Sequence, residues 1–397
     1  MADILFLAHR IPYPPDKGDK IRAWHLLEHL TQTHRVHLGA FIDDPNDRRY
    51  VEKLGSICAS TYFVDIDPRW GKVRALTGLL TGEPLTLPFY QNAGMQHWVD
   101  AHIANGVDRV LTYSSAMARF VMQHASARRI MDFVDIDSDK WRQYAPTKPW
   151  PLSWIYRREG EKMLAWERRV AAEFDTSLFV SAAEAADFQA LAPESAHKVS
   201  YFHNGVDAEY FSPDRPYSNP YSDLYPSSRQ AMVFTGAMDY WPNIDAVLWF
   251  AAEVLPSLRA KLADCLFAIV GSKPSAEVMA LADQPNILVT GRVEDVRPYL
   301  AHAAVVVAPM RIARGIQNKV LEGLAMAKPV VVSPQALEGI NAQPSREVWL
   351  APDAPAMVDA IIAAMNDDQI GPAGRQRVLD SFSWCNNLVR VDQLLEA

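Results

Sequence analysis

The sequence has little cysteine, no long apolar run and no excess of positive charge. Only three cysteines occur among 397 residues, Cys58, Cys265 and Cys385, and none has Cys-x-x-Cys spacing. This argues against a disulfide framework or a structural zinc site and indicates a reducing compartment. No stretch reaches the roughly 18 apolar residues of a membrane span. The first residues, MADILFLAHR, read as a strand rather than a signal peptide, so we expect a cytoplasmic protein.

The charge balance and the missing motifs exclude several classes of protein. Lys and Arg total 39 against 47 Asp and Glu, and the net charge of −8 disfavours bulk attraction to nucleic acid. No G-x-G-x-x-G fingerprint, Walker A loop or G-x-S-x-G elbow occurs. A standard dehydrogenase, a P-loop NTPase and a hydrolase triad are therefore disfavoured. Hydrophobic residues make up 49% of the chain, which is ordinary globular usage and enough for two or three domains.

Short apolar runs alternate with helical patterns in both halves of the chain, which is typical of parallel sheets with helical crossovers. In the first half the predicted strands are 4–8, 36–41, 110–113, 129–133 and 177–180. In the second half they are 232–235, 266–270, 287–289, 305–308 and 329–332. Three of the latter run into a glycine, at Gly236, Gly271 and Gly291, where backbone can approach a ligand.

The most informative segment, residues 309–329, reads PMRIARGIQNKVLEGLAMAKP and follows a predicted strand. Gly315 punctuates a loop, and apolar residues then recur at helical spacing. We therefore expect a helix that starts near Ile316. The free N–H groups and the dipole of such a helix end favour phosphate binding.

Charged residues gather around this expected helix end. Arg311, Arg314 and Lys319 supply three cations, which suits a diphosphate. Glu322 stands three positions after Lys319 on the same helical face, where its carboxylate can accept hydrogen bonds from a ribose diol. A second interpretation stays open, in which Lys319 and Glu322 form a surface ion pair and the arginines are solvated.

Several longer stretches resemble a known family. These are HNGVDAEYFSP (203–213), the glycine-ended strands FTG, IVG and VTGRVEDVRPYLAHAAVVVAP, and GIQNKVLEGLAMAKPVVVS. They resemble GT-B glycosyltransferases of the large retaining GT4 group. FTGAMDYWPNIDAVLWF (234–250) and DFVDIDSDKW (132–141) are similar to a subgroup found with exopolysaccharide clusters of the exosortase/PEP-CTERM system. The resemblance covers nearly the whole chain.

The resemblance implies an α/β fold of two Rossmann-like, doubly wound domains with the active site in the cleft between them. The expected organisation is an acceptor-side domain at 1–205, a linker at 206–230 and a nucleotide-sugar domain at 231–375. A closing helix at 376–397 is expected to cross back onto the first domain. The donor is expected to be a UDP or GDP sugar, the acceptor a glycan, and no cofactor is implied.

The family's functional positions map onto this sequence with one departure. Glu322 matches the second family glutamate, which holds the nucleotide ribose. Arg314 stands eight positions earlier, where the first family glutamate contacts the donor sugar. The loop at 237–243 lacks the cations that the family commonly uses for the pyrophosphate. We therefore expect Lys319, Arg314 and Arg311 to supply that charge.

Shorter matches add further donor-binding residues. Arg292 and Val293 match the stretch that frames the base, and Gly18 matches an N-domain loop glycine that closes over the donor phosphate. Lys20 and Arg22, close to this glycine, are expected to reach the phosphate or an acidic acceptor, with a solvated helix face as the alternative. The remaining expected donor-binding residues lie at strand ends or at the helix tip: Gly236, Asn243, Gly271, Gly315, Ile316, Gln317 and Asn318.

The expected chemistry follows from charge. Breaking a glycosyl–phosphate bond leaves negative charge on the diphosphate, so preorganised donors aimed at it are the main need. The resemblance implies retention by front-face attack, in which the departing phosphate takes the acceptor proton, and no protein nucleophile is named. The catalytic candidates are Lys319, Arg314, Asp135 and His9. Asp135 resembles an acceptor-side position of the family, and an ordinary buried or loop role stays open for His9.

Two D-x-D tripeptides, Asp65-x-Asp67 and Asp135-x-Asp137, invite a metal interpretation. Such tripeptides are common by chance, and the second half already provides a phosphate site, so we expect no metal.

Tryptophans and basic residues are mixed in two segments, 150–169 and 70–74. Indoles beside cations suit an anionic lipid surface, and this would fit a lipid-linked acceptor at the inner face of the cytoplasmic membrane. The alternative is a helix that uses Trp as a core anchor and leaves its arginines solvated.

The leading hypothesis is a retaining sugar transferase of the hexosyltransferase type in exopolysaccharide assembly. Two alternatives stay open: a nucleotide-sugar epimerase or hydrolase of the same fold, and a non-catalytic GT-B subunit that binds a partner or glycan.

Overall fold

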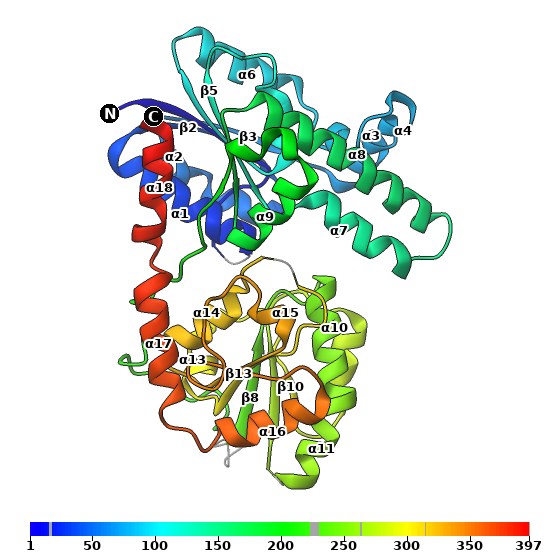
Figure 1. Cartoon of the computed structure of the whole chain (residues 1–397), viewed down its shortest axis with the longest axis vertical. Helices are drawn as coiled ribbons and strands as arrows, with labels where there is room; N and C mark the ends of the chain where they lie inside the picture. Colours follow the sequence, from blue (N-terminus) through cyan, green and yellow to red (C-terminus); the bar gives the residue numbers. More distant parts are fainter. Residues whose placement is uncertain (16–17, 223–229, 263, 314, 397) are drawn as a thin grey trace. The chain divides into compact units, whose positions relative to one another are not determined.

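The computed structural model describes residues 1–15, 18–222, 230–262, 264–313 and 315–396 (Figure 1). The chain forms two compact units. Unit 1 comprises Met1–His203 together with Leu388–Ala397, and unit 2 comprises Asn204–Asn387. Each unit is built around one parallel sheet.

Unit 1 contains a seven-stranded sheet in the order β3-β2-β1-β4-β5-β6-β7. The strands are β1 Asp3–Ala8, β2 Arg35–Ile42, β3 Ser60–Asp65, β4 Arg109–Tyr113, β5 Arg128–Val134, β6 Thr176–Phe179 and β7 Val199–Tyr201. The sequence pattern predicts five of them and misses β3 and β7. Both lie at sheet edges, and their side chains are mostly half-buried or exposed, so neither shows the continuous apolar run of a central strand.

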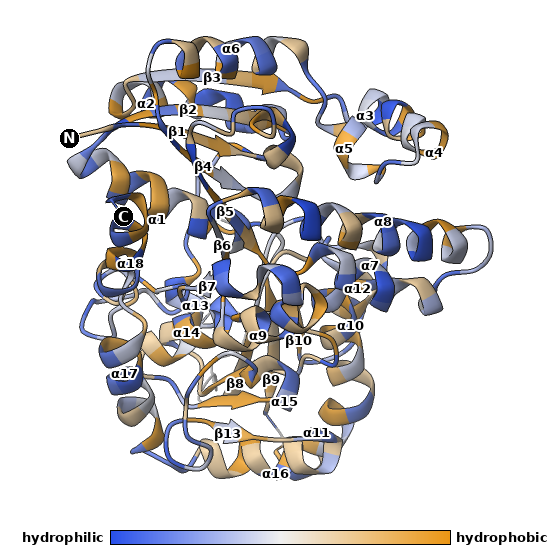
Figure 2. Ribbon diagram, turned by 45° about the horizontal axis from the view of Figure 1, so that its top comes forward, coloured by the Kyte–Doolittle hydropathy of each residue, from blue (hydrophilic) through white to orange (hydrophobic). Residues whose placement is uncertain are grey.

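Helices of unit 1 cover this sheet and extend from it. They are α1 Gly18–Thr33, α2 Val51–Ile57, α3 Pro68–Ala75, α4 Thr77–Thr81, α5 Thr86–Phe89, α6 Ala93–Ala104, α7 Asp137–Tyr144, α8 Leu152–Glu173 and α9 Ala182–Leu191. Helices α7 and α8 lie side by side and reach beyond the sheet (Figures 1 and 2).

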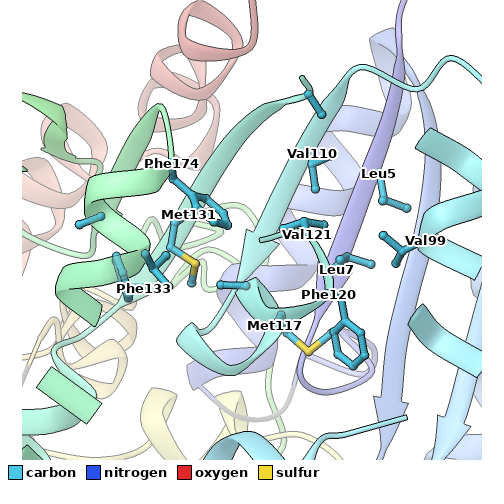
Figure 3. Packing of buried hydrophobic residues seen from close by; sticks show 14 of the residues in the cluster. Leu5, Leu7, Val99, Val110, Met117, Phe120, Val121, Met131, Phe133 and Phe174 are labelled. Carbon is cyan, nitrogen blue, oxygen red and sulfur yellow. The ribbon is translucent and has the colours of Figure 1, made fainter. Parts of the chain in front are cut away.

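The core of unit 1 is made by the apolar strands and the helices packed against them. Figure 3 shows side chains of β1, such as Leu5 and Leu7, near Val110 of β4 and Val99 of α6. Each of these four residues has no exposed surface. Burial on this scale supplies the main driving force for folding.

Unit 2 contains a six-stranded sheet in the order β10-β9-β8-β11-β12-β13. Its strands are β8 Ala231–Thr235, β9 Leu266–Val270, β10 Ile287–Val289, β11 Val305–Ala308, β12 Val330–Val332 and β13 Trp349–Leu350. Its helices are α10 Trp241–Trp249, α11 Leu255–Lys261, α12 Ala276–Ala280, α13 Arg297–Ala301, α14 Asn318–Ala325, α15 Pro334–Leu337, α16 Ala354–Ala364 and α17 Ile370–Ser381. The sequence pattern misses only β13, a two-residue edge strand.

The C-terminal segment is two helices, because α17 ends at Ser381 and α18 runs over Trp384–Glu396. The residues between them belong to unit 2, where the backbone N–H of Val206 donates to the carbonyl of Phe382 at 2.8 Å. The end of α18 belongs to unit 1. There Arg109 Nε and Arg128 Nε donate to backbone carbonyls of α18 at 2.9 and 2.7 Å.

The strand order of each sheet reverses beside its first strand. The reversal lies between β1 and β4 in unit 1 and between β8 and β11 in unit 2. In open parallel sheets, ligands bind outside the carboxyl ends of the strands at such a switch point.

Candidate functional site

The switch point of unit 2 holds Lys319, in the first turn of α14. Its Nζ donates to Asn243 Oδ1 at 2.8 Å and lies 4.8 Å from the centre of the Phe234 ring. Asn243 Nδ2 in turn donates to the carbonyl of Ala237 at 2.9 Å, which directs the amide oxygen toward the lysine. The segment after β8 therefore positions a cation that comes from the segment after β11.

The glycines at the neighbouring strand ends permit this close arrangement. A Cβ atom on Gly236 would lie 2.7 Å from Asn243 Nδ2, and one on Gly271 would lie 1.7 Å from the carbonyl oxygen of Gly236. A Cβ on Gly291 would meet nothing within 4 Å, but its φ of +67° favours glycine. Two of the three expected strand-end glycines thus let protein segments approach one another.

Thr235, at the carboxyl end of β8, is a residue of this site that sequence reasoning missed. It ends β8, is only 4% exposed, and its hydroxyl has no hydrogen-bond partner within the described part of the chain. A buried polar atom without a partner calls for an explanation. The only sequence signal is its place between the apolar strand and Gly236.

Burial shifts the two central charges of the site toward neutrality. Desolvation lowers the pKa of Lys319 to about 8 and raises the pKa of Glu322 to about 7, although each charge favours the other. Among the described residues no ion pair joins the two side chains, and none pairs with Glu322. A polyanion beside Lys319 would favour its protonated form.

Helix α14 starts two residues later than the sequence pattern predicts. Gly315 has a φ of +62°, and Gln317 is an extended N-cap residue whose side chain makes no capping bond. Ile316 and Gln317 therefore precede the helix, which begins at Asn318. Asn318 Oδ1 accepts a hydrogen bond from Asn204 Nδ2 at 3.3 Å.

The other expected cations of unit 2 lie in different settings. Arg311 is exposed, and its Nε donates to Asp245 Oδ2 on α10 at 2.9 Å. Arg292 is also exposed, and Val293 beside it is half-buried. Arg314 lies outside the described residues. Arg311 is thus paired with a carboxylate, whereas Lys319 meets a neutral amide.

The basic residues near Gly18 of unit 1 are buried and paired with carboxylates. Lys20 is 2% exposed and its Nζ donates to Asp47. Arg22 is fully buried, donates to both carboxylate oxygens of Asp132 at 2.8 and 3.2 Å, and lies over Phe202. Both cations are therefore neutralised inside unit 1, and Gly18 itself begins α1.

His9 lies at the switch point of unit 1, directly after β1. Its Nε2 is 3.4 Å from Asp19 Oδ2, and its ring stacks on Tyr113 at the end of β4. Its Nδ1 is buried and has no hydrogen-bond partner within the described chain. Arg10 contacts Asp19 at 2.5 Å and Asp43 at 2.9 Å, so His9 sits at the edge of an ion-pair cluster.

Asp135 follows β5 at the same edge of the sheet. Lys140 Nζ lies 2.9 Å from Asp135 and 3.5 Å from Asp137, so one ammonium bridges the second D-x-D pair. Ser115 Oγ donates to Asp137 at 2.8 Å. In the first D-x-D pair, Asp65 binds Arg48 and Asp67 caps α3.

The backbone around Asp135 is strained, and two glutamate side chains accept hydrogen bonds from it. Val134 and Ser114, at the ends of neighbouring strands, have φ values of +70° and +75°, which are unusual for residues with a side chain and cluster at functional sites. Glu184 accepts from the N–H of Ile136 at 2.8 Å, and Glu167 from that of Ser138 at 3.0 Å. Burial raises the pKa of Glu167 to about 8.

At the level of sequence, the match to a known family lies in unit 2. Residues 229–367 match the family model of the glycosyl transferases group 1. Among curated proteins, none matches this sequence significantly.

Solved structures resemble the chain over its whole length. A sucrose-phosphate synthase from Thermosynechococcus elongatus is 18% identical with a TM-score of 0.73, over 99% of this chain and 98% of that one. HepE from Anabaena, in complex with UDP-glucose, is 14% identical with a TM-score of 0.70 over 100% of both chains. WaaG, a glycosyltransferase involved in lipopolysaccharide biosynthesis, is 15% identical with a TM-score of 0.62 over 99% of both.

At these identities the similarity establishes the fold, which is the GT-B fold of two Rossmann-like parallel-sheet domains. Together with the family match, it supports a glycosyltransferase.

Proposed function

We propose that this protein is a retaining hexosyltransferase that moves a sugar from a nucleotide-diphosphate sugar to a glycan acceptor. The observation that carries the proposal is Lys319, held by the neutral amide of Asn243 at the switch point of unit 2. A cation whose nearest partner is uncharged keeps its attraction for an incoming anion. The same unit matches the glycosyl transferases group 1.

In the proposed reaction, the Lys319 ammonium stabilises the negative charge that develops on the leaving diphosphate. Such preorganised donors usually supply the largest single part of catalysis in this kind of reaction. The N–H groups at the start of α14 add to the positive potential. Glu322, one turn further along the helix, accepts hydrogen bonds from the ribose hydroxyls, and the Thr235 hydroxyl is a further donor at the strand end.

Unit 1 is proposed to bind the acceptor. His9 and Asp135 stand at the carboxyl edge of its sheet, on either side of β4. In the proposed front-face route, the glycosyl–phosphate bond breaks and the acceptor oxygen bonds to the same face of the anomeric carbon. The acceptor proton passes to the departing phosphate, so His9 and Asp135 orient the acceptor hydroxyl.

The acceptor is proposed to be a lipid-linked glycan of exopolysaccharide assembly, met at the inner face of the cytoplasmic membrane. The resemblance of residues 132–141 and 234–250 to transferases of such clusters supports this assignment. UDP is the first nucleotide to test, since the Anabaena HepE structures contain UDP and UDP-glucose.

Thermal-shift measurements with UDP, GDP and their sugars test donor binding, because a ligand that binds only the folded state raises the melting temperature. We expect a clear shift with one nucleotide. Glu322→Ala should reduce the shift, whereas Lys261→Ala, at an exposed lysine of unit 2 paired with Asp359, should keep it. A shift of equal size in Glu322→Ala and the parent would contradict the site.

Turnover assays with the bound nucleotide sugar test the reaction. We expect transfer to a glycan acceptor, with the donor's anomeric configuration kept in the product, as read by NMR. An inverted product would refute retention. Epimerised or hydrolysed donor would identify the alternative enzyme, and binding without turnover across an acceptor panel would identify the non-catalytic subunit.

A further inference from the structure

Exposed apolar side chains of unit 1 concentrate in two short segments. Helices α3 and α4 and the turn between them carry Trp70, Val73, Leu76, Leu79 and Leu80. The first turn of α8 and the residues before it carry Trp150, Leu152 and Trp154. Leu80 is 90% exposed and Trp150 is 82% exposed. All three exposed tryptophans of the described chain lie in these segments, which is far more than scattered surface hydrophobics.

The two segments form parts of one surface. Arg158 of α8 donates to the carbonyls of Gly78 at 2.7 Å and Glu83 at 3.2 Å. Glu159 accepts from the backbone N–H groups of Leu85 and Thr86 at 2.7 and 3.0 Å. Trp154 precedes Arg158 by one helical turn and therefore lies on the same side of α8. We name the eight apolar residues, with their basic neighbours, the Trp–Leu surface.

The inner side of α3 is already in contact with unit 1, so its outer side is the one left uncovered. A Cβ on Gly71 would lie 2.5 Å from Phe89 Cε2, which shows how closely α3 packs on α5. Trp70 and Val73 nevertheless stay 68% and 54% exposed. Trp70 and Val73 are therefore exposed although α3 is packed against α5.

Cations surround the apolar residues although the chain as a whole is acidic. Arg69, Lys72 and Arg74 on α3 and Arg157 on α8 are exposed, whereas the net charge of the protein is −8. The acidic residues nearby are Asp67, which caps α3, and the exposed Glu83 and Glu161. Figure 2 shows hydrophilic and hydrophobic residues interleaved along α3, α4 and α8.

We propose that the Trp–Leu surface docks unit 1 on an anionic lipid bilayer. Indoles and leucines enter the interfacial layer, and the flanking lysine and arginine side chains bind lipid headgroups. Within the described ranges no helix is long and apolar enough to span a membrane, so this contact is peripheral. The inference rests on the proposed function for its purpose, because it brings the enzyme to a lipid-linked acceptor.

Vesicle co-sedimentation of the full chain tests this surface. We expect binding to vesicles of equal parts phosphatidylcholine and phosphatidylglycerol, weakening as salt rises, and little binding to phosphatidylcholine alone. Leu80→Ser with Trp154→Ser should abolish binding. Lys72→Ala with Arg157→Ala should weaken partitioning about 25-fold, at the roughly fivefold per cation that anionic membranes provide.

Matched variants separate this surface from general stickiness. Met279 and Leu379 of unit 2 are exposed to a similar degree as Trp154, and Met279→Ser with Leu379→Ser should bind vesicles like the parent. Binding left intact by Leu80→Ser with Trp154→Ser, or a parent chain that stays in the supernatant at low salt, would overturn the proposal. So would self-association in solution that the same pair of substitutions abolishes, because the surface would then join two copies of the chain.

Nucleotide binding provides the second readout. The variants of the Trp–Leu surface should keep the thermal shift with the donor nucleotide, because their substitutions lie in unit 1, whereas Lys319 belongs to unit 2. If no nucleotide raises the melting temperature of the parent chain, the proposed function is refuted, and the vesicle result still stands. Loss of vesicle binding with a normal shift would refute only the docking surface.

Discussion

The switch points of the two units differ in how they treat positive charge. In unit 1, Arg10, Lys20 and Arg22 are each paired with carboxylates, two of them deep in the core. In unit 2, Lys319 meets a neutral amide and an aromatic ring. The switch point of unit 1 thus holds cations paired with carboxylates, whereas in unit 2 the Lys319 ammonium is bound by a neutral amide.

The largest expected effect is a loss of stability when a buried ion pair of unit 1 is broken. Arg22→Met leaves Asp132 buried without its partner, and we expect the free energy of unfolding of unit 1 to fall by about 3–5 kcal/mol. Urea denaturation followed by tryptophan fluorescence measures this change. Lys261→Met, which removes a pair with Asp359 in which both side chains are exposed, should cost no more than about 1 kcal/mol. Equal losses in the two variants would contradict the contrast.

The next effect concerns the functional half. Lys319→Ala should slow sugar transfer about 100- to 1000-fold, as expected for loss of one donor to a developing anion. Steady-state assays with saturating donor measure it, and a melting temperature close to that of the parent shows that folding is intact. A fall in stability with normal turnover would make Lys319 a structural residue like Arg22.

The pH dependence of donor binding sharpens the comparison. Binding needs protonated Lys319, whose pKa is about 8, and ionised Glu322, whose pKa is about 7. Affinity for the nucleotide sugar should therefore fall as pH rises above 8 and as it falls below 7, which calorimetry at several pH values measures. A nucleotide sugar is preferred to UDP, because it lacks the terminal phosphate group that titrates near pH 6.

Two conservative variants assign the limbs of this profile. Lys319→Arg stays charged at all relevant pH values and should lose the alkaline limb. Glu322→Gln does not ionise and should lose the acidic limb. A profile that both variants leave unchanged would assign the titration to other groups.

The last expected effect concerns Glu167, which accepts from the N–H of Ser138 close to the strained segment of unit 1. Its pKa is raised from the ordinary 4.5 to about 8 by burial. Between these values the folded state holds a proton that the unfolded state has lost, so stability falls as pH rises. Glu167→Gln, which keeps the acceptor for the N–H of Ser138, should remove this slope and stabilise the protein at pH 8 by at least about 1 kcal/mol. Thermal unfolding at several pH values measures the slope, and an unchanged slope would contradict the assignment.

Central strands and the place of Lys319 could be predicted from local pattern. The buried strands are short apolar runs, and helical spacing puts Lys319 and Glu322 in the first turns of α14. The edge strands β3, β7 and β13 could not be predicted in this way, because half-buried strands lack continuous apolar runs. The partners of the cations also escape local pattern: Lys319 meets Asn243, 76 positions away, and Arg22 meets Asp132, 110 positions away.

Unit 1 contains both ends of the chain, because its main body stops at His203 and its last piece starts at Leu388. On the ribosome, Arg109 and Arg128 therefore emerge long before the carbonyls of α18 that they will bind. Domains usually fold in order of synthesis, but here the second unit is complete before the first receives its final helix. The N-terminal unit can therefore form its last hydrogen bonds only after α18 has been synthesised.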